Sequence, residues 1–519
     1  MKMRKVAAMT GLAGVLLAMG MTAAQASAVT PSAGDLSASV IDDYMRDYVE
    51  RTGLPGATVA VTKGDQVVHV AGYGHTAGGE AITKGTPMPL ASLSKSFTAL
   101  AVLRLADERK ISLDAAVQTY LPEFTMADPR AAKITVRQLL QQTSGMSDQS
   151  FPELTLAAPD TLKDAVGMLR TAPLASEPGT KMAYHNPNYA VAARLVEVVA
   201  GVPFADHMAA NVFGPLGMTS TATVNTTSDL PGRGAGYIRA YGQVVERSQP
   251  KWFINGGAGV VSTADDLARW LIAQNGAGGV LPEKILKTAQ SASGVAGSTY
   301  GMGWSEGKTD GGAPRLQHTG WLLTHNSVQT LLPESTYGIA VVTNTGMISG
   351  DDALLITNGL IDVVEGRPVA GAVPFTMSAD LWLAGLSVLN LGLGILGVYR
   401  AGSWARRREG PGRLACDRET DSVRGADRVL LRSRGPDRLR DEQGGHAGAD
   451  HICVARAVCL GCHRRTRRCR RRRLSFRPPR SCPGRSWTCR RDVRTAGNDH
   501  ISCVKQSRKR FSTADHTYS

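Results

Sequence analysis

Apolar and polar residues alternate in two separate parts of the chain. Ala57–Thr62 and Val67–Ala71 alternate on either side of a Lys-Gly-Asp turn, which predicts a β-hairpin. Ser327–Leu332 and Tyr337–Thr343 alternate in the same way around a Pro-Glu-Ser turn. Because the two pairs are far apart in sequence, one sheet would have to be built from both ends of this region.

Helical spacing dominates between the two strand pairs. Apolar residues recur at that spacing over roughly Ser92–Arg109 and over Tyr189–Val199, within sequence that is mostly helical or loop-like. A final helix is expected over Asp351–Val364. The pattern predicts a mixed α/β (α+β) fold for residues 35–365, with a helical lobe inserted into one sheet.

The N-terminus, residues 1–28, has the three parts of an export signal. Basic residues within the first five positions precede the uncharged apolar run Val6–Met21, and small residues follow at 24–28. A buried first helix is the alternative, but it would need neither the basic start nor the small residues. We therefore expect export and cleavage of the signal.

A second apolar run, Leu381–Val398, predicts a transmembrane helix. Its length at ~1.5 Å per residue just crosses a hydrocarbon core of roughly 30 Å. Basic residues follow at Arg406–Arg408 and are retained in the cytoplasm. We expect a linker over 366–380 and an anchor in the cell membrane, with the catalytic domain on the extracellular side. A buried C-terminal helix is the alternative.

Charge and cysteine divide the chain near residue 400. Residues 1–400 carry 29 Lys+Arg and 32 Asp+Glu, whereas residues 401–519 carry 30 and 12 and hold all eight cysteines. The first part therefore carries a net charge of −3 and the tail one of +18, which together give the +15 of the whole chain. The cysteine-free, near-neutral first part excludes a disulfide-stapled small fold and a basic nucleic-acid-binding body.

The tail, residues 399–519, offers chemistry that we do not assign. Cys459–His463 matches a haem-attachment signature. The cysteines of the tail could bind zinc, and the arginines of 464–473 could bind nucleic acid. Arginine, cysteine and proline crowd together there and apolar periodicity disappears, as in a GC-rich gene read out of frame. We expect disorder beyond about residue 410 and no nucleic-acid partner.

The candidate nucleophile lies in a Ser-x-x-Lys motif. The motif occurs three times, at Ser92/Lys95, Ser248/Lys251 and Ser305/Lys308. Positions i and i+3 share a helix face, so a lysine can take the serine proton. Only Ser92 opens a long apolar helix; the second motif contains a proline, and the third lies in a Gly-rich stretch typical of a turn. An ordinary helix N-cap remains the alternative for Ser92.

Two further elements supply polar groups. Tyr184-His185-Asn186 precedes a helix, where a tyrosine can relay a proton and an asparagine can bind a substrate amide. His318-Thr319-Gly320 lies beside the late strands, and its glycine permits close approach of a substrate backbone. Lys308-Thr309 is followed by Asp310 and is not assigned. His185 is expected at the rim of the site.

The three motifs, in the order Ser-x-x-Lys, Tyr-x-Asn and His-Thr-Gly, resemble those of the penicillin-recognising serine hydrolases. The resemblance is to the branch of class C β-lactamases, D-alanyl-D-alanine carboxypeptidases and related esterases. Further local matches are Leu139–Met146, Pro215–Met218, Gly256–Thr263 and Tyr300–Trp304. The resemblance covers roughly residues 35–365. It implies a β-lactamase/transpeptidase-like fold, with an antiparallel sheet flanked by helices and an inserted all-helical lobe.

The resemblance also implies roles for single residues. Ser92 would be acylated, Lys95 would be its base, and Tyr184 would pass a proton to the leaving group. Substrate-binding roles fall on Asn186, His318, Thr319 and Gly320. The backbone N–H groups of Ser92 and Trp321 would form the oxyanion hole.

Some features depart from the family pattern or receive no catalytic role. Gln142 replaces the histidine that relatives usually have, and Trp321-Leu322-Leu323 is bulky where many relatives have small residues. Asp265-Asp266 is read as a capped helix start rather than an acid/base pair. His69, His75 and His325 have no ligand partner at metal spacing, so we expect no metal and no cofactor.

Together these features predict an exported, membrane-anchored serine hydrolase. Its expected substrates are D-Ala-D-Ala-type peptides, or related small amides and esters, which form an acyl-enzyme. A β-lactamase is the alternative within the enzymes, and a catalytically silent penicillin-binding or sensor membrane protein is the alternative outside them.

Overall fold

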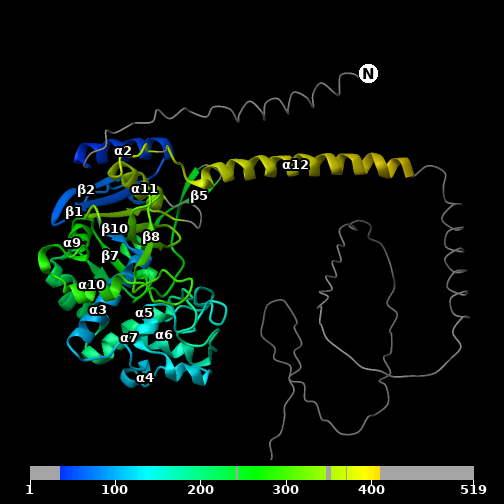
Figure 1. The fold of residues 1–519 in the computed structure, drawn as a ribbon. Helices are drawn as coiled ribbons and strands as arrows, with labels where there is room; N and C mark the ends of the chain where they lie inside the picture. The colour runs from blue at the N-terminus through cyan, green and yellow to red at the C-terminus, as the bar shows by residue number, and fades with distance from the viewer. Residues whose placement is uncertain (1–35, 241–242, 347–351, 370, 409–519) are drawn as a thin grey trace, which may run out of the picture. The chain divides into compact units, whose positions relative to one another are not determined.

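A six-stranded antiparallel sheet forms the centre of the computed structural model, which describes residues 36–240, 243–346, 352–369 and 371–408 (Figure 1). The sheet order is β2-β1-β11-β10-β9-β8. Its strands are β1 (Gly56–Lys63), β2 (Gln66–Gly74), β8 (Ser305–Lys308), β9 (Pro314–Trp321), β10 (Asn326–Leu332) and β11 (Tyr337–Thr343). The expected export signal and the tail from residue 409 lie outside the described residues.

The two ends of the domain meet in the middle of this sheet. β1 pairs antiparallel with β11, with Ala57 opposite Thr343 and Lys63 opposite Tyr337. Side chains alternate between two cores along β1: Val59 and Val61 pack on one face and Ala60 on the other. The predicted sheet, built from both ends of the domain, is therefore confirmed.

Helices cover both faces of the sheet. α2 (Ala38–Thr52) and α11 (Asp352–Val364) pack on one face, and α9 (Ala264–Gln274) packs on the other (Figure 1). The Thr263 side chain caps α9 by accepting from the Asp266 amide, which confirms the predicted helix start.

The helical lobe is inserted between β2 and β8. Its helices are α4 (Val117–Tyr120), α5 (Val136–Leu140), α6 (Leu162–Met168), α7 (Pro187–Ala200) and α8 (Phe204–Met208). α3 (Ser94–Asp107) and α10 (Glu283–Gln290) pack together, and α3 also packs against α7. α3 thus joins the lobe to the sheet side and belongs to a continuous apolar core.

Ser305–Lys308 corrects the sequence analysis, because it is strand β8 rather than a turn. Its polar, Gly-containing sequence shows no alternation, but backbone pairing with β9 holds it at the sheet edge. Two small sheets were also not predicted. They are β3 (Met88–Pro89), β7 (Val260–Ser262) and β4 (Ala222–Thr223), and β12 (Thr345–Gly346), β5 (Gly236–Ala240) and β6 (Gln243–Arg247).

A long apolar helix, α12 (Phe375–Arg408), follows the domain. It begins at Phe375 rather than at Leu381, so part of the expected linker is helical. Phe375–Ala405 has the length and hydropathy of a membrane span, and none of its apolar window is buried.

Candidate active site

Ser92 lies in a single 3-10 turn between β3 and α3. The turn spans Ala91–Leu93, and α3 begins only at Ser94. Ala91 has a φ of 48°, a left-handed conformation that is uncommon for a residue with a side chain. The Ser94 hydroxyl donates to the Ala91 carbonyl at 2.6 Å, which holds the turn. Ser92 is not a helix N-cap.

Lys95 is fully buried and has three polar neighbours. Its Nζ lies 3.0 Å from Ser92 Oγ, 2.9 Å from Asn186 Oδ1 and 2.9 Å from the Gly257 carbonyl oxygen. Burial lowers the pKa of Lys95 to about 7, although the charge of Glu153 acts in the opposite direction.

The neighbours of Lys95 also determine how a neutral amine would be oriented. A neutral amine has two N–H groups and one lone pair. The amide and carbonyl oxygens of Asn186 and Gly257 can only accept, so they take the two N–H groups. The lone pair is then directed at the Ser92 hydroxyl, which is the arrangement of a general base and its nucleophile.

Tyr184 completes this group. Both Tyr184 and Ser92 line the same cavity, and Lys95 Nζ lies 4.8 Å from the centre of the Tyr184 ring. Desolvation raises the pKa of Tyr184 above its ordinary value, so the hydroxyl keeps its proton at neutral pH. The structure therefore brings together the three residues to which we gave catalytic roles.

Gln142, noted as a departure from the family pattern, holds the Tyr184–Asn186 loop. Its Oε1 accepts from the backbone N–H of His185 at 3.1 Å and from Nδ2 of Asn188 at 2.6 Å. Gln142 is buried and has a φ of 59°. The substitution thus still fixes the segment that carries Tyr184 and Asn186.

His185 is not at the rim, which corrects the sequence analysis. Its side chain is fully buried, and Nδ1 lies 2.7 Å from Oδ1 of Asp148. The imidazole packs edge-on against Phe151. The residue between Tyr184 and Asn186 therefore has a packing role, which no local pattern indicated.

His318 is neutral and is held in one tautomer. Its Nδ1 lies 2.7 Å from the Thr319 carbonyl oxygen, which can only accept, so Nδ1 carries the proton. Nε2 then accepts from the Tyr300 hydroxyl at 3.0 Å. Burial and the Lys95 charge lower the pKa of His318 to about 3. The site has no positive charge at the position where many relatives have lysine.

Gly320 brings strand β9 against the nucleophile. A Cβ atom at this position would lie 3.0 Å from the Ser92 nitrogen and 2.6 Å from the Leu90 carbonyl oxygen. Only glycine permits this approach. It places the end of β9, with Trp321, beside the Ser92 backbone, and the oxyanion hole formed by their two N–H groups stays a prediction.

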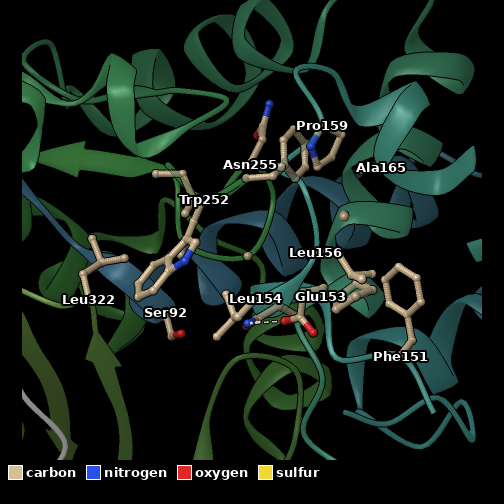
Figure 2. Close-up of a pocket in the computed structure, with 18 of the residues that line it drawn as sticks. Ser92, Phe151, Glu153, Leu154, Leu156, Pro159, Ala165, Trp252, Asn255 and Leu322 are labelled. Carbon is tan, nitrogen blue, oxygen red and sulfur yellow. Dashed lines mark hydrogen bonds between the residues drawn. The ribbon is translucent and has the colours of Figure 1, made fainter. Parts of the chain in front are cut away.

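A cavity of about 430 Å³ opens beside Ser92 (Figure 2). Most of its lining is apolar and includes Phe151, Leu154, Leu156, Ala165, Met168, Trp252, Phe253, Ile254 and Leu322. The expected substrate-binding residues Asn186 and Thr319 also line it, together with Trp321. The bulky Trp321 and Leu322 therefore form one wall of a substrate-sized hollow.

A second hollow, of about 360 Å³, lies on the other side of Tyr184 and Thr319. It shares these two residues with the first cavity, and its lining also includes His318, Tyr300 and Arg315. Tyr184 and Thr319 are thus flanked by two hollows, whereas Ser92 lines the first of them.

Glu153 is the functional candidate that sequence reasoning missed. Its Oε1 accepts from Asn186 Nδ2 at 2.9 Å, the dashed line in Figure 2, and its carboxyl group lines the first cavity. Burial raises the pKa of Glu153 to about 7. It follows Phe-Pro in a loop without a motif, so no signal in the sequence indicated it.

Two residues of the same loop form, with His185, a group of three side chains that could hold a metal ion, within the described part of the chain. Ligand atoms of Asp148, Glu153 and His185 all lie within 4.8 Å of one another. The sequence analysis did not find this group. Its expectation that the protein uses no metal stays a prediction.

The other two Ser-x-x-Lys motifs are not assembled in this way. Lys251 forms a surface ion pair with Asp160 at 2.7 Å. Lys308 is exposed on edge strand β8. The choice of Ser92 over these serines is therefore supported by the partners of each lysine.

Comparisons with known proteins give the family and the fold. The family model described as Beta-lactamase matches residues 41–358. Protein flp of Staphylococcus aureus (strain NCTC 8325 / PS 47) is 26% identical over 313 residues, 59% of this chain and 62% of that protein. The D-aminopeptidase of Brucella canis is 27% identical over 332 residues, 61% of each chain. The chain thus matches less than two thirds of the length of these curated relatives.

A solved structure supports the fold at lower identity. The octameric penicillin-binding protein homologue from Pyrococcus abyssi has a TM-score of 0.55 and is 21% identical. The match covers 65% of this chain and 79% of that chain. It confirms the predicted β-lactamase/transpeptidase-like architecture.

Proposed function

This chain belongs to the beta-lactamase family, and from that premise we propose that it is an exported, membrane-anchored serine hydrolase. It forms an acyl-enzyme on Ser92 with D-Ala-D-Ala-type peptides or related amides and esters. The observation that carries this proposal is Lys95, a buried amine with its lone pair directed at Ser92 Oγ. The curated relative named D-aminopeptidase supports an amide or peptide as the substrate.

The reaction follows from the positions of the groups. Lys95 takes the Ser92 proton while Oγ attacks the substrate carbonyl carbon, and the N–H groups of Ser92 and Trp321 stabilise the oxyanion. Tyr184 gives its proton to the leaving group as the carbonyl–leaving-group bond breaks, and Lys95 returns the proton to Tyr184. In the second half of the reaction, Tyr184 passes its proton to Lys95 and takes one from the water molecule that attacks the acyl carbon. The bond between the acyl carbon and Ser92 Oγ then breaks, Lys95 returns a proton to Oγ, and the acid is released.

The second hollow is assigned to the leaving group. Arg315 is the cationic side chain of its lining and suits a terminal carboxylate. His318 is neutral and cannot supply this charge. We expect Arg315→Gln to raise KM about 10-fold for a peptide that ends in a carboxylate. KM for the amide-capped peptide should change little, and equal effects on both peptides would remove Arg315 from this role.

Membrane anchoring is supported by α12, whose apolar residues are not buried in the protein. Export is supported by the N-terminal sequence pattern, with its basic start and small-residue exit. Together they support the proposal that the catalytic domain lies on the extracellular side of the cell membrane.

Turnover distinguishes hydrolysis from silent binding. The full-length protein in detergent is incubated with a D-alanyl-D-alanine peptide and, separately, with a cephalosporin, and release of D-alanine or ring opening is followed. Ser92→Ala serves as the control. Turnover of the peptide by wild type alone supports the proposal, turnover of the cephalosporin alone makes the protein a β-lactamase, and labelling without turnover makes it a binding protein.

A further inference from the structure

The cavity beside Ser92 has an unusual distribution of charge. Its described lining is largely apolar and includes neither lysine nor arginine. Glu153 is the one carboxylate of that lining. Burial raises the pKa of this carboxyl group to about 7, so it is ionised only above that pH. A ligand group of opposite charge in the cavity would favour the ionised form, and the carboxyl group therefore points to such a ligand group.

The partners of Glu153 within the protein leave its charge largely uncompensated. Oε1 accepts a hydrogen bond from the neutral amide of Asn186. On its other side, Oε2 lies 3.6 Å from Nδ1 of His185. That imidazole has its pKa lowered by burial and lies 2.7 Å from a second carboxylate, Asp148. Two acids therefore meet one neutral imidazole and one neutral amide.

The nearby Lys95 does not replace a ligand cation. Its Nζ donates to Asn186 and Gly257 and faces Ser92, and it must be neutral to act as the base. Its low pKa means that it gives little positive charge in the active state. The side chain of Glu153 is still 18% exposed, so a ligand can reach it from the cavity.

Position relative to the nucleophile defines which part of a substrate meets Glu153. The amide of Asn186 touches Lys95 Nζ through Oδ1 and Glu153 through Nδ2, both at 2.9 Å. Lys95 in turn contacts Ser92 Oγ at 3.0 Å. The carboxylate is therefore two short contacts from the base. It lines the first cavity, which is left for the acyl group because the second hollow is assigned to the leaving group.

We infer that the acyl donor is an aminoacyl amide, ester or peptide with a free ammonium group next to its carbonyl and a bulky apolar side chain. Glu153 binds the ammonium group, and the apolar wall formed by Phe151, Leu156 and Met168 receives the side chain. This inference rests on the proposed function and narrows its substrate class. Donors with an acidic acyl group are repelled by Glu153 and Asp148.

Three matched donors test this inference on the full-length protein in detergent. They are thioesters of phenylalanine, of N-acetylphenylalanine and of 3-phenylpropionic acid, with the two amino-acid donors in both D and L forms. All carry the same ring, but only the first carries an ammonium group. The variants are Glu153→Gln, which keeps an acceptor for Asn186, and Glu177→Gln, an exposed glutamate of the same lobe that pairs with Arg130.

Wild type should acylate with phenylalanyl thioester, in one of its enantiomers, about 10- to 100-fold faster in kcat/KM than with the other two donors. A rate preference of this size is what one hydrogen bond between opposite charges contributes. Glu153→Gln should remove the preference and change 3-phenylpropionyl transfer less than about 3-fold, and Glu177→Gln should change nothing.

Two results would overturn the inference, and a third would contradict the proposed function. Equal losses on all three donors in Glu153→Gln would overturn the inference and make Glu153 a positioning residue for Asn186. A wild-type preference for the N-acetyl donor would overturn it as well. Acylation by none of the donors and by no β-lactam would instead contradict the proposed function itself.

Discussion

Lys95 determines the chemistry of the site at the scale of single residues. Desolvation is the largest influence on this amine, and it stabilises the neutral form that catalysis needs. Because the folded pKa is about 7 rather than the ordinary 10.5, the base is available at neutral pH. A surface lysine with an ordinary pKa would be protonated almost completely under the same conditions.

A pH dependence of acylation follows from this pKa. The rate should rise as pH increases through about 7 and then level off, because the neutral amine is the active form. Lys95→Ala should abolish acylation at every pH. Stopped-flow measurement with a chromogenic β-lactam from pH 5 to about 9 checks both statements. A rate that is flat over this range would exclude Lys95 as the base.

Tyr184 should act on the leaving group rather than on the attack. Tyr184→Phe keeps the ring beside Tyr300 but removes the hydroxyl that gives a proton. We expect acylation by amides to slow by ~10²–10⁴-fold, and acylation by a matched thioester to slow much less. Rates on the matched pair measure the difference. Equal losses would leave the hydroxyl with a positional role only.

The sequence predicted the residues that meet at the site, to which we give catalytic roles, and missed those that support them. Ser92 and Lys95 share one turn, so their contact follows from spacing alone. Glu153 and Gln142 reach the site from loops whose paths depend on tertiary packing. The spacing of apolar residues along the chain does not specify the path of a loop. The only sign in the sequence that these loops matter was that Gln142 departs from the family pattern.

At the scale of elements, the site depends on the close approach of β9 to the turn that carries Ser92. The strands with clear alternation, such as β1 and β11, were predicted from sequence. β8 and β9 were not, because polar residues that serve the edge and the site interrupt their alternation. Functional residues thus obscure the strand pattern where the sheet meets the nucleophile.

Gly320→Ala tests whether activity needs this close contact between β9 and the turn that carries Ser92. Its Cβ would meet two backbone atoms, and neither can rotate away as a side chain could. We expect a loss of acylation of at least ~100-fold and a destabilisation of about 1–3 kcal/mol from overpacking. Gly85→Ala is the control, because the nearest atom to its Cβ would lie at 3.9 Å. Calorimetric unfolding and acylation rates give the two values. Full activity in Gly320→Ala would show that β9 can move away without cost.

At the scale of the whole molecule, the hydrolase domain and α12 have separate roles in our account. The domain has its own cores between sheet and helices, whereas no residue in the apolar window of α12 is buried in the described structure. Cutting the chain after residue 370 should therefore release a soluble, active enzyme. Fractionation of cells and turnover by the released protein measure this. A folded but inactive fragment would show that the helix is more than an anchor.

The central claim is that Ser92 becomes acylated, and intact-mass spectrometry with peptide mapping tests it most directly. Full-length wild type, Ser92→Ala and Lys95→Ala are each incubated with a β-lactam and with an aminoacyl thioester. We predict one added acyl mass in wild type, located on the peptide that contains Ser92, and no added mass in either variant. An adduct on another residue, or no adduct with either donor, would contradict the account.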